Sequence, residues 1–379
     1  MTTKDKKVYP KLTEIPKHLV DVYMTKTQVK EGTYYNNFYT DMKATIIRWL
    51  DAFQKGNYTL TEDETGNIYV APKSSKNSNI VLAAHMDMVH TNGHPKQLYY
   101  EEQTGKLWAI NKDKKQTSLG ADDKNGIFVI LEVYRTVKPD ELPSVVFTVD
   151  EECGCLGSSD IDEKFFEDKD HCIVIDRRNQ YDLIYKGSST VYGVTTPPLF
   201  KTLNPQFKFT TGSISDANQF SEFVDCINVS CGYYNPHGST EYTQVDELLE
   251  TADAVKTFVL NANTTKASKE ANLEFLGLFN TTTSYYNSWY NTKSSTTTTK
   301  KTTKASTYYE DYWDDYYGVS DDYWNKYNDP FDKTCPVCGQ HKCYDSKTKT
   351  CWFCGDVTQY AGYEELEKEE QTEMTEVLK

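Results

Sequence analysis

The sequence predicts an α/β fold, a sandwich with a largely parallel central sheet. Two observations carry this prediction. Four short apolar runs have the character of buried strands, and they lie at residues 80–84, 145–149, 172–175 and 226–230. Patterns with helical periodicity lie between or after these runs, and such alternation is typical of units that build a parallel sheet.

The helical patterns accompany the apolar runs along the chain. From about Thr33 to Phe53, apolar residues recur at helical spacing, which predicts an amphipathic helix ahead of the first strand. Further helical patterns cover residues 126–134, after the first strand, and residues 245–259, after the last. We expect these elements to form one domain over residues 1–265.

The acidic composition narrows the classes of partner. The chain has 379 residues and a formal net charge of −15. Nucleic acid and anionic membranes attract cationic surfaces, so we expect neither to bind this chain broadly. The first twenty residues hold no apolar core of signal-peptide length, and no stretch reaches the roughly 18 apolar residues of a membrane span. These features favour a cytoplasmic protein.

The character of the chain changes after residue 265. Residues 266–330 are of low complexity and rich in Thr, Tyr and Asp, which predicts a disordered linker. Its aromatic side chains also allow docking on a protein partner or on the first domain, so a binding role stays open. Residues 331–358 form a cysteine-rich module, and residues 359–379 form a charged tail.

The cysteine-rich module indicates a local metal site. Two Cys-x-x-Cys-Gly turns are separated by twelve residues (339 to 350), and such paired turns can direct four thiolates at one ion. His341 or Cys343 could replace one ligand, and a disulfide pairing is less expected in a reducing compartment. A docking or stabilising role is favoured over nucleic-acid binding. We expect a zinc-ribbon-like knuckle whose structural zinc is bound by Cys335, Cys338, Cys351 and Cys354.

Acidic residues and histidines follow the predicted strands. Each of the four apolar runs ends in, or is soon followed by, such a residue, and two aspartates open the helix after SLGA. In open α/β sheets ligands bind beyond the carboxyl ends of the strands, so these side chains should converge on one face. The residues are His85, Asp87, Asp122, Asp123, Glu151, Glu152, Asp176 and His237.

This collection of side chains favours a pair of metal ions. Carboxylates gathered without compensating bases repel one another, and divalent cations are the simplest remedy. Imidazole together with carboxylate suits zinc, with cobalt or manganese as possible substitutes, and argues against calcium. Taken singly, each residue has a simpler role, as a hydrogen-bonded core histidine or a helix-capping aspartate.

Six short elements resemble, in order, those of the co-catalytic dinuclear zinc exopeptidases. That family includes the peptidase T, carboxypeptidase and deacetylase group and the lid-less aminopeptidases. The resemblance covers roughly residues 67–259 and implies the phosphorylase/hydrolase-like zinc peptidase sandwich of the family. The elements are AHMDMVH, SLGADDKNG, VDEECGCLGS, VIDRR, TGSISDANQF and GYYNPHGSTEY.

The resemblance implies two zinc sites that share one aspartate. His85 and Asp176 would complete the first site, Glu152 and His237 would complete the second, and Asp122 would bridge them. The pair of ions would lower the pKa of a water molecule and polarise the scissile carbonyl.

Two further acids receive catalytic roles from the same resemblance. Glu151 would be the base that takes a proton from water and delivers it to the leaving amine. Asp87, two residues after His85, would lie behind the first metal and orient its histidine ligand.

One departure from the family bears on the substrate. Peptidase T and carboxypeptidase relatives carry a lid of about a hundred residues between the aspartate ligand and the Ser-Asp element. Here only 38 residues (177 to 214) separate Asp176 from Ser215, so we expect no lid domain. The architecture favours an aminopeptidase or tripeptidase acting on short peptides. A hydrolase of N-acyl amino acids and a non-catalytic scaffold on the same fold remain as alternatives.

Overall fold

The computed structural model describes residues 9–27, 40–89 and 94–279, together with the backbone of three short strands near the C-terminus. The chain divides into two units, residues 1–282 and 283–379, and each is considered by itself. In the second unit, β15 (Tyr344–Asp345), β16 (Thr350–Cys351) and β17 (Gly355–Asp356) form an antiparallel sheet. The side chains of the predicted structural zinc site lie outside the described residues, so that site stays a prediction: Cys335, Cys338, Cys351 and Cys354.

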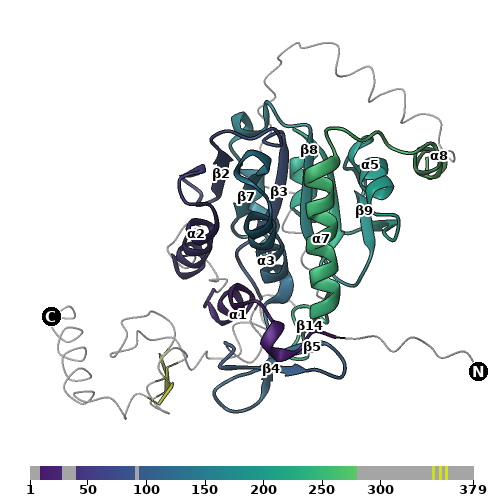
Figure 1. Ribbon diagram of the computed structural model, residues 1–379. Coiled ribbons are helices and arrows are strands. Elements are labelled where there is room, and N and C mark those ends of the chain that lie inside the picture. The colour runs from purple at the N-terminus through teal and green to yellow at the C-terminus, as the bar shows by residue number, and fades with distance from the viewer. Residues whose placement is uncertain are drawn as a thin grey trace, which may run out of the picture. The chain divides into compact units, whose positions relative to one another are not determined.

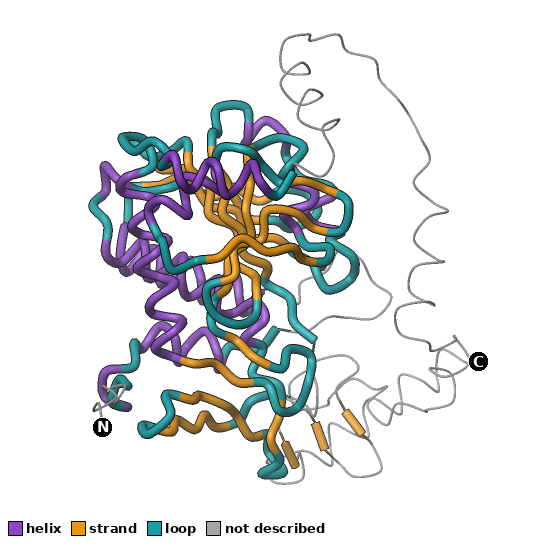
Figure 2. The backbone as a smooth tube through the Cα atoms, turned by 90° about the vertical axis from the view of Figure 1, so that its right-hand side faces the viewer, coloured by secondary structure: helices purple, strands orange, loops and turns teal. Residues whose placement is uncertain are grey.

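A mixed sheet forms the centre of the first unit (Figures 1 and 2), and it has nine strands. The strands follow the order β1-β2-β7-β3-β8-β12-β9-β10, and β11 pairs with β9. Their bounds are β1 (Tyr58–Glu62), β2 (Ile68–Pro72), β3 (Ile80–His85), β7 (Ser144–Thr148), β8 (His171–Arg177), β9 (Asp182–Gly187), β10 (Thr190–Val191), β11 (Lys208–Gly212) and β12 (Asp225–Ser230).

The four central strands, β7, β3, β8 and β12, run parallel to one another. They coincide with the four apolar runs of the sequence, so the predicted parallel sheet is confirmed. Both faces of these strands are buried, and successive residues alternate between two separate cores. Along β3, Leu82 belongs to one core and Val81 and Ala83 to the other. A strand covered on both faces reads as a continuous apolar run, which explains the pattern.

Helices cover both faces of the sheet and complete a three-layer sandwich. The longer helices pack on the face toward the viewer in Figure 1, and α6 packs on the other face with α4 beside it. The bounds are α1 (Lys17–Met24), α2 (Thr40–Gln54), α3 (Ala121–Thr136), α5 (Thr196–Leu203) and α7 (Val245–Asn261) on the first face, and α4 (Leu156–Ser159) and α6 (Asp216–Phe220) on the second.

All three predicted helices are present. Helix α2 covers the part of the first pattern that the structure describes, and residues 33–39 of that pattern lie outside it. Helix α3 approaches β8 closely at Gly126. A Cβ atom there would lie 2.4 Å from the carbonyl oxygen of Ile175 and 2.5 Å from Asp123 Oδ2. Only glycine allows this approach, which brings the start of α3 to the end of β8.

A second, small sheet was not predicted. It consists of β4 (Gln97–Glu101), β5 (Lys106–Ile110), β6 (Gln116–Thr117), β13 (Tyr233–Tyr234) and β14 (Tyr242–Gln244). Strand β14 pairs with β5, and thereby joins the hairpin that carries His237 to the segment between His85 and Asp122. Its strands are short and largely half-exposed, so they leave a weak apolar pattern.

The segment in which relatives carry a lid belongs to the sheet itself. Residues 177–214 contribute β9, β10, α5 and β11, so the expectation of a core without a lid domain is confirmed. Helix α8 (Lys269–Gly277) lies within the segment for which composition predicts a linker. It is anchored by buried Phe275, whose ring lies edge-on to Tyr185 at 5.5 Å. The ordered chain therefore continues past residue 265. None of the described helices is long and apolar enough to cross a membrane.

Candidate metal centre

The five predicted metal ligands converge at the carboxyl edge of the central sheet. Strand β3 ends at His85, β8 carries Asp176 near its end, and Glu152 follows β7. Asp122 lies at the start of α3, and His237 lies in the loop between β13 and β14. Because β3, β7 and β8 are parallel, their ends meet at one edge, as the sequence analysis expected.

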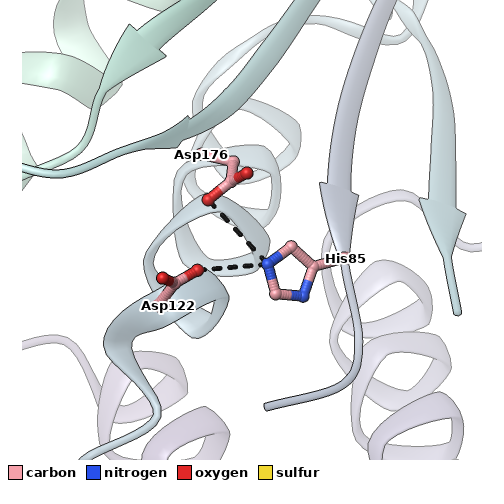
Figure 3. Close-up of side chains that lie close together, drawn as sticks. All are labelled: His85, Asp122 and Asp176. Carbon is pink, nitrogen blue, oxygen red and sulfur yellow. Dashed lines mark hydrogen bonds and ion pairs between the residues drawn. The ribbon is translucent and has the colours of Figure 1, made fainter. Parts of the chain in front are cut away.

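These side chains form two groups that share Asp122. The ligand atoms of His85, Asp122 and Asp176 all lie within 4.8 Å of one another, and so do those of Asp122, Glu152 and His237. Figure 3 shows Asp122 and Asp176 facing the imidazole of His85. The pairing of residues in the two groups is the one that the family resemblance implied.

Asp122 lies between two histidines. Its Oδ1 atom is 3.1 Å from Nε2 of His85, and its Oδ2 atom is 3.3 Å from Nε2 of His237. Asp176 Oδ1 lies 3.8 Å from the same nitrogen of His85, and Glu152 Oε1 lies 2.8 Å from that of His237. A carboxylate that directs one oxygen to each group is suited to bridge two cations.

The donor atoms fit divalent ions of the zinc class. Each group offers one imidazole nitrogen and carboxylate oxygens, a mixture that zinc and related metals accept. The buried Oε1 atom of Glu152 is close to His237 but accepts no hydrogen bond of acceptable geometry from the described residues. Buried polar atoms without such a partner are rare, and an ion between the two side chains would satisfy it.

The electrostatics of the site also favour cations. Burial, followed by the charge of Asp122, raises the pKa of both Glu152 and Asp176. For His237, burial alone would lower the pKa, but the adjacent carboxylates of Asp122 and Glu152 outweigh it and raise the pKa to about 11. Carboxylates and imidazoles arranged in this way bind protons tightly, and metal ions compete for the same positions.

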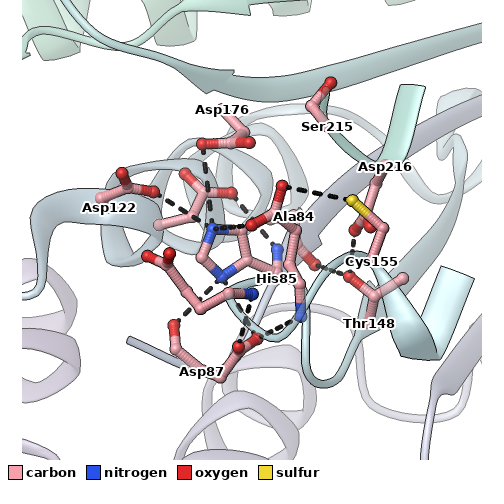
Figure 4. Close-up of polar contacts among 12 residues, drawn as sticks. Ala84, His85, Asp87, Asp122, Thr148, Cys155, Asp176, Ser215 and Asp216 are labelled. Atoms are coloured by element: carbon pink, nitrogen blue, oxygen red, sulfur yellow. Dashed lines mark hydrogen bonds and ion pairs between the residues drawn. The ribbon is translucent and has the colours of Figure 1, made fainter. Parts of the chain in front are cut away.

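Asp87 holds two of the ligand-bearing segments together. Its fully buried carboxylate accepts the backbone N–H of Glu151 at 3.1 Å and that of Glu152 at 2.9 Å. The same carboxylate lies 3.3 Å from Nδ1 of His85, on the side of the ring opposite Asp122. Figure 4 shows this network around His85. The predicted role of Asp87 in orienting His85 is consistent with these contacts.

Glu151 lies beside the two groups without belonging to either. Its Oε2 atom is 4.0 Å from Nε2 of His85, and the thiol of Cys155 donates to Oε1 at 3.7 Å. Burial raises the pKa of Glu151 well above its usual value. Nearby Asp216 already accepts hydrogen bonds from Thr148 and Ser158, both at 2.5 Å, so its carboxylate is engaged within the fold.

Two residues that support the ligands were missed in the sequence. Glu241 accepts the backbone N–H groups of Gly120 at 2.6 Å and of Asp122 at 3.2 Å. Asn228 of β12 brackets the backbone of Asp176, with its oxygen accepting the N–H at 3.1 Å and its amide donating to the carbonyl at 3.0 Å. The sequence offered one signal for each residue. Asn228 is an amide within an apolar strand, and Glu241 is an acid four residues after the candidate ligand His237.

The N-terminal segment is hydrogen-bonded to the chain segments that carry His85 and Asp122. The buried ammonium group of Lys124 donates to the carbonyl oxygens of Tyr23 at 3.1 Å and of Thr25 at 2.8 Å. Burial lowers the pKa of Lys124 to about 7. Thr27 donates to the carbonyl of Met86, directly after His85. Residues far apart in sequence thus fix the segments that carry His85 and Asp122.

Comparison with known proteins identifies solved structures that share the fold of this chain. No protein-family model matches the chain, and no curated protein sequence does. Among solved structures, aminopeptidase PepT from Bacillus cereus ATCC 10987 matches with a TM-score of 0.52 at 14% identity, covering 64% of this chain and 96% of that one. A tripeptidase from Staphylococcus aureus subsp. aureus Mu50 matches with a TM-score of 0.53 at 13% identity, with the same coverage. The chain therefore has the fold of these two peptidases.

Proposed function

We propose that this chain is a dinuclear metal-dependent exopeptidase that acts on short peptides, with zinc as its metal. The observation that carries the proposal is the pair of ligand groups that share Asp122. The fold, which two peptidases of known structure share, supports it.

The proposed ligands divide between two ions. His85 and Asp176 would hold one ion, Glu152 and His237 would hold the other, and Asp122 would bind both. When bound, the ions would lower the pKa of water and polarise the scissile carbonyl.

Glu151 would carry the proton in this reaction. It lies outside both ligand groups, and its carboxylate reaches to 4.0 Å from the imidazole of His85. A carboxylate in this position would accept a proton from water and return it to the leaving amine. Asp87 would keep the backbone of Glu151 in place through its hydrogen bond. The residue that transfers the proton is thus separate from the residues that hold the ions.

The charge of the site supports cleavage at the amino end of a peptide. Within the described residues, the ion pairs of the site carboxylates are formed with His85 and His237. A free ammonium group is attracted to such a site, whereas a free carboxylate beside the scissile bond is repelled. We therefore propose an aminopeptidase or tripeptidase. The carboxylate groups on or beside the site are more numerous than the four positive charges that two divalent ions would bring. They belong to Asp87, Asp122, Asp123, Glu151, Glu152, Asp176, Asp216 and Glu241.

The experiment compares the full chain with its Glu151→Gln variant on a panel of di- and tripeptides. We expect the wild-type chain to release amino acids and the variant to be about 10²- to 10⁴-fold slower, the usual contribution of a general base. Its metal content should be unchanged. The control is Glu163→Gln, which alters an exposed glutamate outside the site. Full activity of Glu151→Gln would show that the proton is carried by another group.

Substrates with an acylated amino group test whether the chain cleaves peptides with a free amino terminus or N-acyl amides. N-acyl amino acids have an amide bond but no free ammonium group, so we expect little hydrolysis of them. If they are the better substrates, the chain is an amidohydrolase with the same centre.

Further proposals concern the rest of the chain. We propose that the cysteine-rich module binds one structural zinc ion, and that the linker and module dock on a protein partner. We also propose a cytoplasmic location. The five cysteines of the described part are free, which agrees with a reducing compartment: Cys153, Cys155, Cys172, Cys226 and Cys231.

A further inference from the structure

Glu241 is a buried acid with an unusual set of partners. Its side chain is 1% exposed, and each carboxylate oxygen accepts a different backbone N–H group. Oε2 accepts from Gly120 at 2.6 Å, and Oε1 accepts from Asp122 at 3.2 Å. These donors lie where α3 begins, and the N-cap residue Gly120 has no side chain to bond them. Glu241 therefore caps α3 from another part of the chain.

The position of Glu241 links the chain segments that carry His237 and Asp122. It lies four residues after His237, in the same loop between β13 and β14. His237 belongs to the second ligand group, and Asp122 is shared by both groups. The loop that supplies one ligand thus also holds the backbone of the bridging ligand.

The two backbone donors explain why an acid stands at this place. Glu241 is buried close to Asp122, where a second carboxylate is unfavourable, and the two hydrogen bonds from backbone N–H groups offset part of that cost. Two diverging donors require two acceptor atoms on one side chain, which a carboxylate provides and an amide does not.

We propose that Glu241 is a positioning residue that fixes Asp122 relative to His237, so that the two ions bind as a coupled pair. The inference rests on the proposed dinuclear site and goes beyond it, because Glu241 is not one of the ligands. It acts through the backbone of Asp122 and of Gly120.

Two substitutions separate position from charge. Glu241→Gln keeps the size of the side chain but turns an NH₂ group toward a backbone N–H donor. Glu241→Asp keeps the charge but is one methylene shorter, so it cannot reach both donors. The matched control is Glu247→Gln. Glu247 is also a buried glutamate, at 8% exposure, and it accepts from the hydroxyl of Tyr234, a bond that glutamine can still accept.

The experiment titrates each full-length protein with Mn²⁺ and records its electron paramagnetic resonance spectrum. Manganese prefers oxygen and nitrogen ligands, so the thiolates of the second unit interfere little. We expect the wild-type chain and Glu247→Gln to bind Mn²⁺ with the spectrum of an exchange-coupled pair. Both Glu241 variants should bind about 10- to 100-fold more weakly, as is typical when a residue supporting a ligand is lost, and without the coupled spectrum.

The outcomes separate this inference from the proposed function. If the wild-type chain binds no coupled pair, the dinuclear site and the role of Glu241 both fail. If the wild-type chain binds the pair and both Glu241 variants bind it equally well, only the role of Glu241 fails. If Glu241→Asp retains the pair while Glu241→Gln loses it, charge rather than position is responsible, and the inference is overturned. If Glu241→Gln does not fold, the shorter Glu241→Asp decides in the same way.

Discussion

The substitution Asp87→Asn removes one hydrogen-bond acceptor from the support of the metal centre. The two oxygens of Asp87 accept the backbone N–H groups of Glu151 and Glu152, at 3.1 and 2.9 Å. Asparagine has nearly the same shape, but one oxygen is replaced by an NH₂ group. Whichever way the amide is oriented, one backbone N–H faces another donor, and the negative charge beside Nδ1 of His85 is lost.

The size of the effect follows from these contacts. One charge-assisted hydrogen bond is lost and one partly buried N–H group is left unpaired, which costs about 1.5–3 kcal/mol. Both N–H groups lie next to the second proposed metal site, and the lost charge lies beside His85, a proposed ligand of the first. We therefore expect the affinity for zinc to fall about 10- to 100-fold, the range found for residues that support metal ligands. The two estimates agree, because a tenfold change in affinity is about 1.4 kcal/mol.

The assay is competition for Zn²⁺ between the full chain and a chromophoric chelator. Asp63→Asn provides a control away from the centre, in the turn between β1 and β2. One oxygen of Asp63 accepts the backbone N–H groups of Gly66 at 2.8 Å and Asn67 at 2.9 Å, and the other accepts from the side-chain amide of Asn67 at 2.9 Å and the hydroxyl of Tyr69 at 2.6 Å. That variant should lose stability and keep its zinc affinity. The reasoning is refuted if Asp87→Asn binds zinc as tightly as the wild-type chain, or if both variants lose affinity equally.

Three further substitutions test packing and electrostatics in other parts of the first unit. Tyr23→Phe removes a buried hydroxyl that bonds to α3 and β14, and it should lower the free energy of unfolding by about 1–3 kcal/mol in urea titration; no change would show that these bonds contribute nothing. Burial alone would raise the pKa of Glu132, but hydrogen bonds from Arg135 and the adjacent imidazole of His18 lower it to about 2, so its ionised form stabilises the fold. Glu132→Gln should therefore destabilise the protein by about 1–3 kcal/mol above pH 4.5, and the difference should shrink as the pH falls toward 2; a difference independent of pH would contradict this. Phe275→Ala should remove about 3–5 kcal/mol of packing from α8, so that proteolysis of α8 accelerates while peptidase activity is kept; unchanged cleavage would mean that α8 is held by other contacts.

The sequence was sufficient to predict the central sheet and the convergence of the candidate ligands at its carboxyl edge. Strands β3, β7, β8 and β12 are buried on both faces, so each appears as an apolar run with a clear end. Because ligands bind where such strands end, residues such as His85 and Asp176 stood out by position. Their division into two groups came from the family resemblance, and the geometry agrees with it.

The supporting contacts could not be predicted in the same way. Glu241 and Asn228 bond to backbone groups, and every residue has those groups, so no pattern of side chains reveals the pairing. The small sheet joins strands of two to five residues from distant parts of the chain, too short for periodicity to be read. Helix α8 lies next to a low-complexity segment and buries two side chains, Ala271 and Phe275, too few to give a periodic pattern.

The central claim is that two ions share Asp122, and the metal content of the full chain and of Asp122→Asn tests it most directly. Both proteins contain the same cysteine-rich module, so the difference between them isolates the proposed centre. We predict that the variant, purified in the same way, contains about two fewer zinc ions per chain, because each group of ligands loses its shared member. An unchanged metal content would contradict the claim.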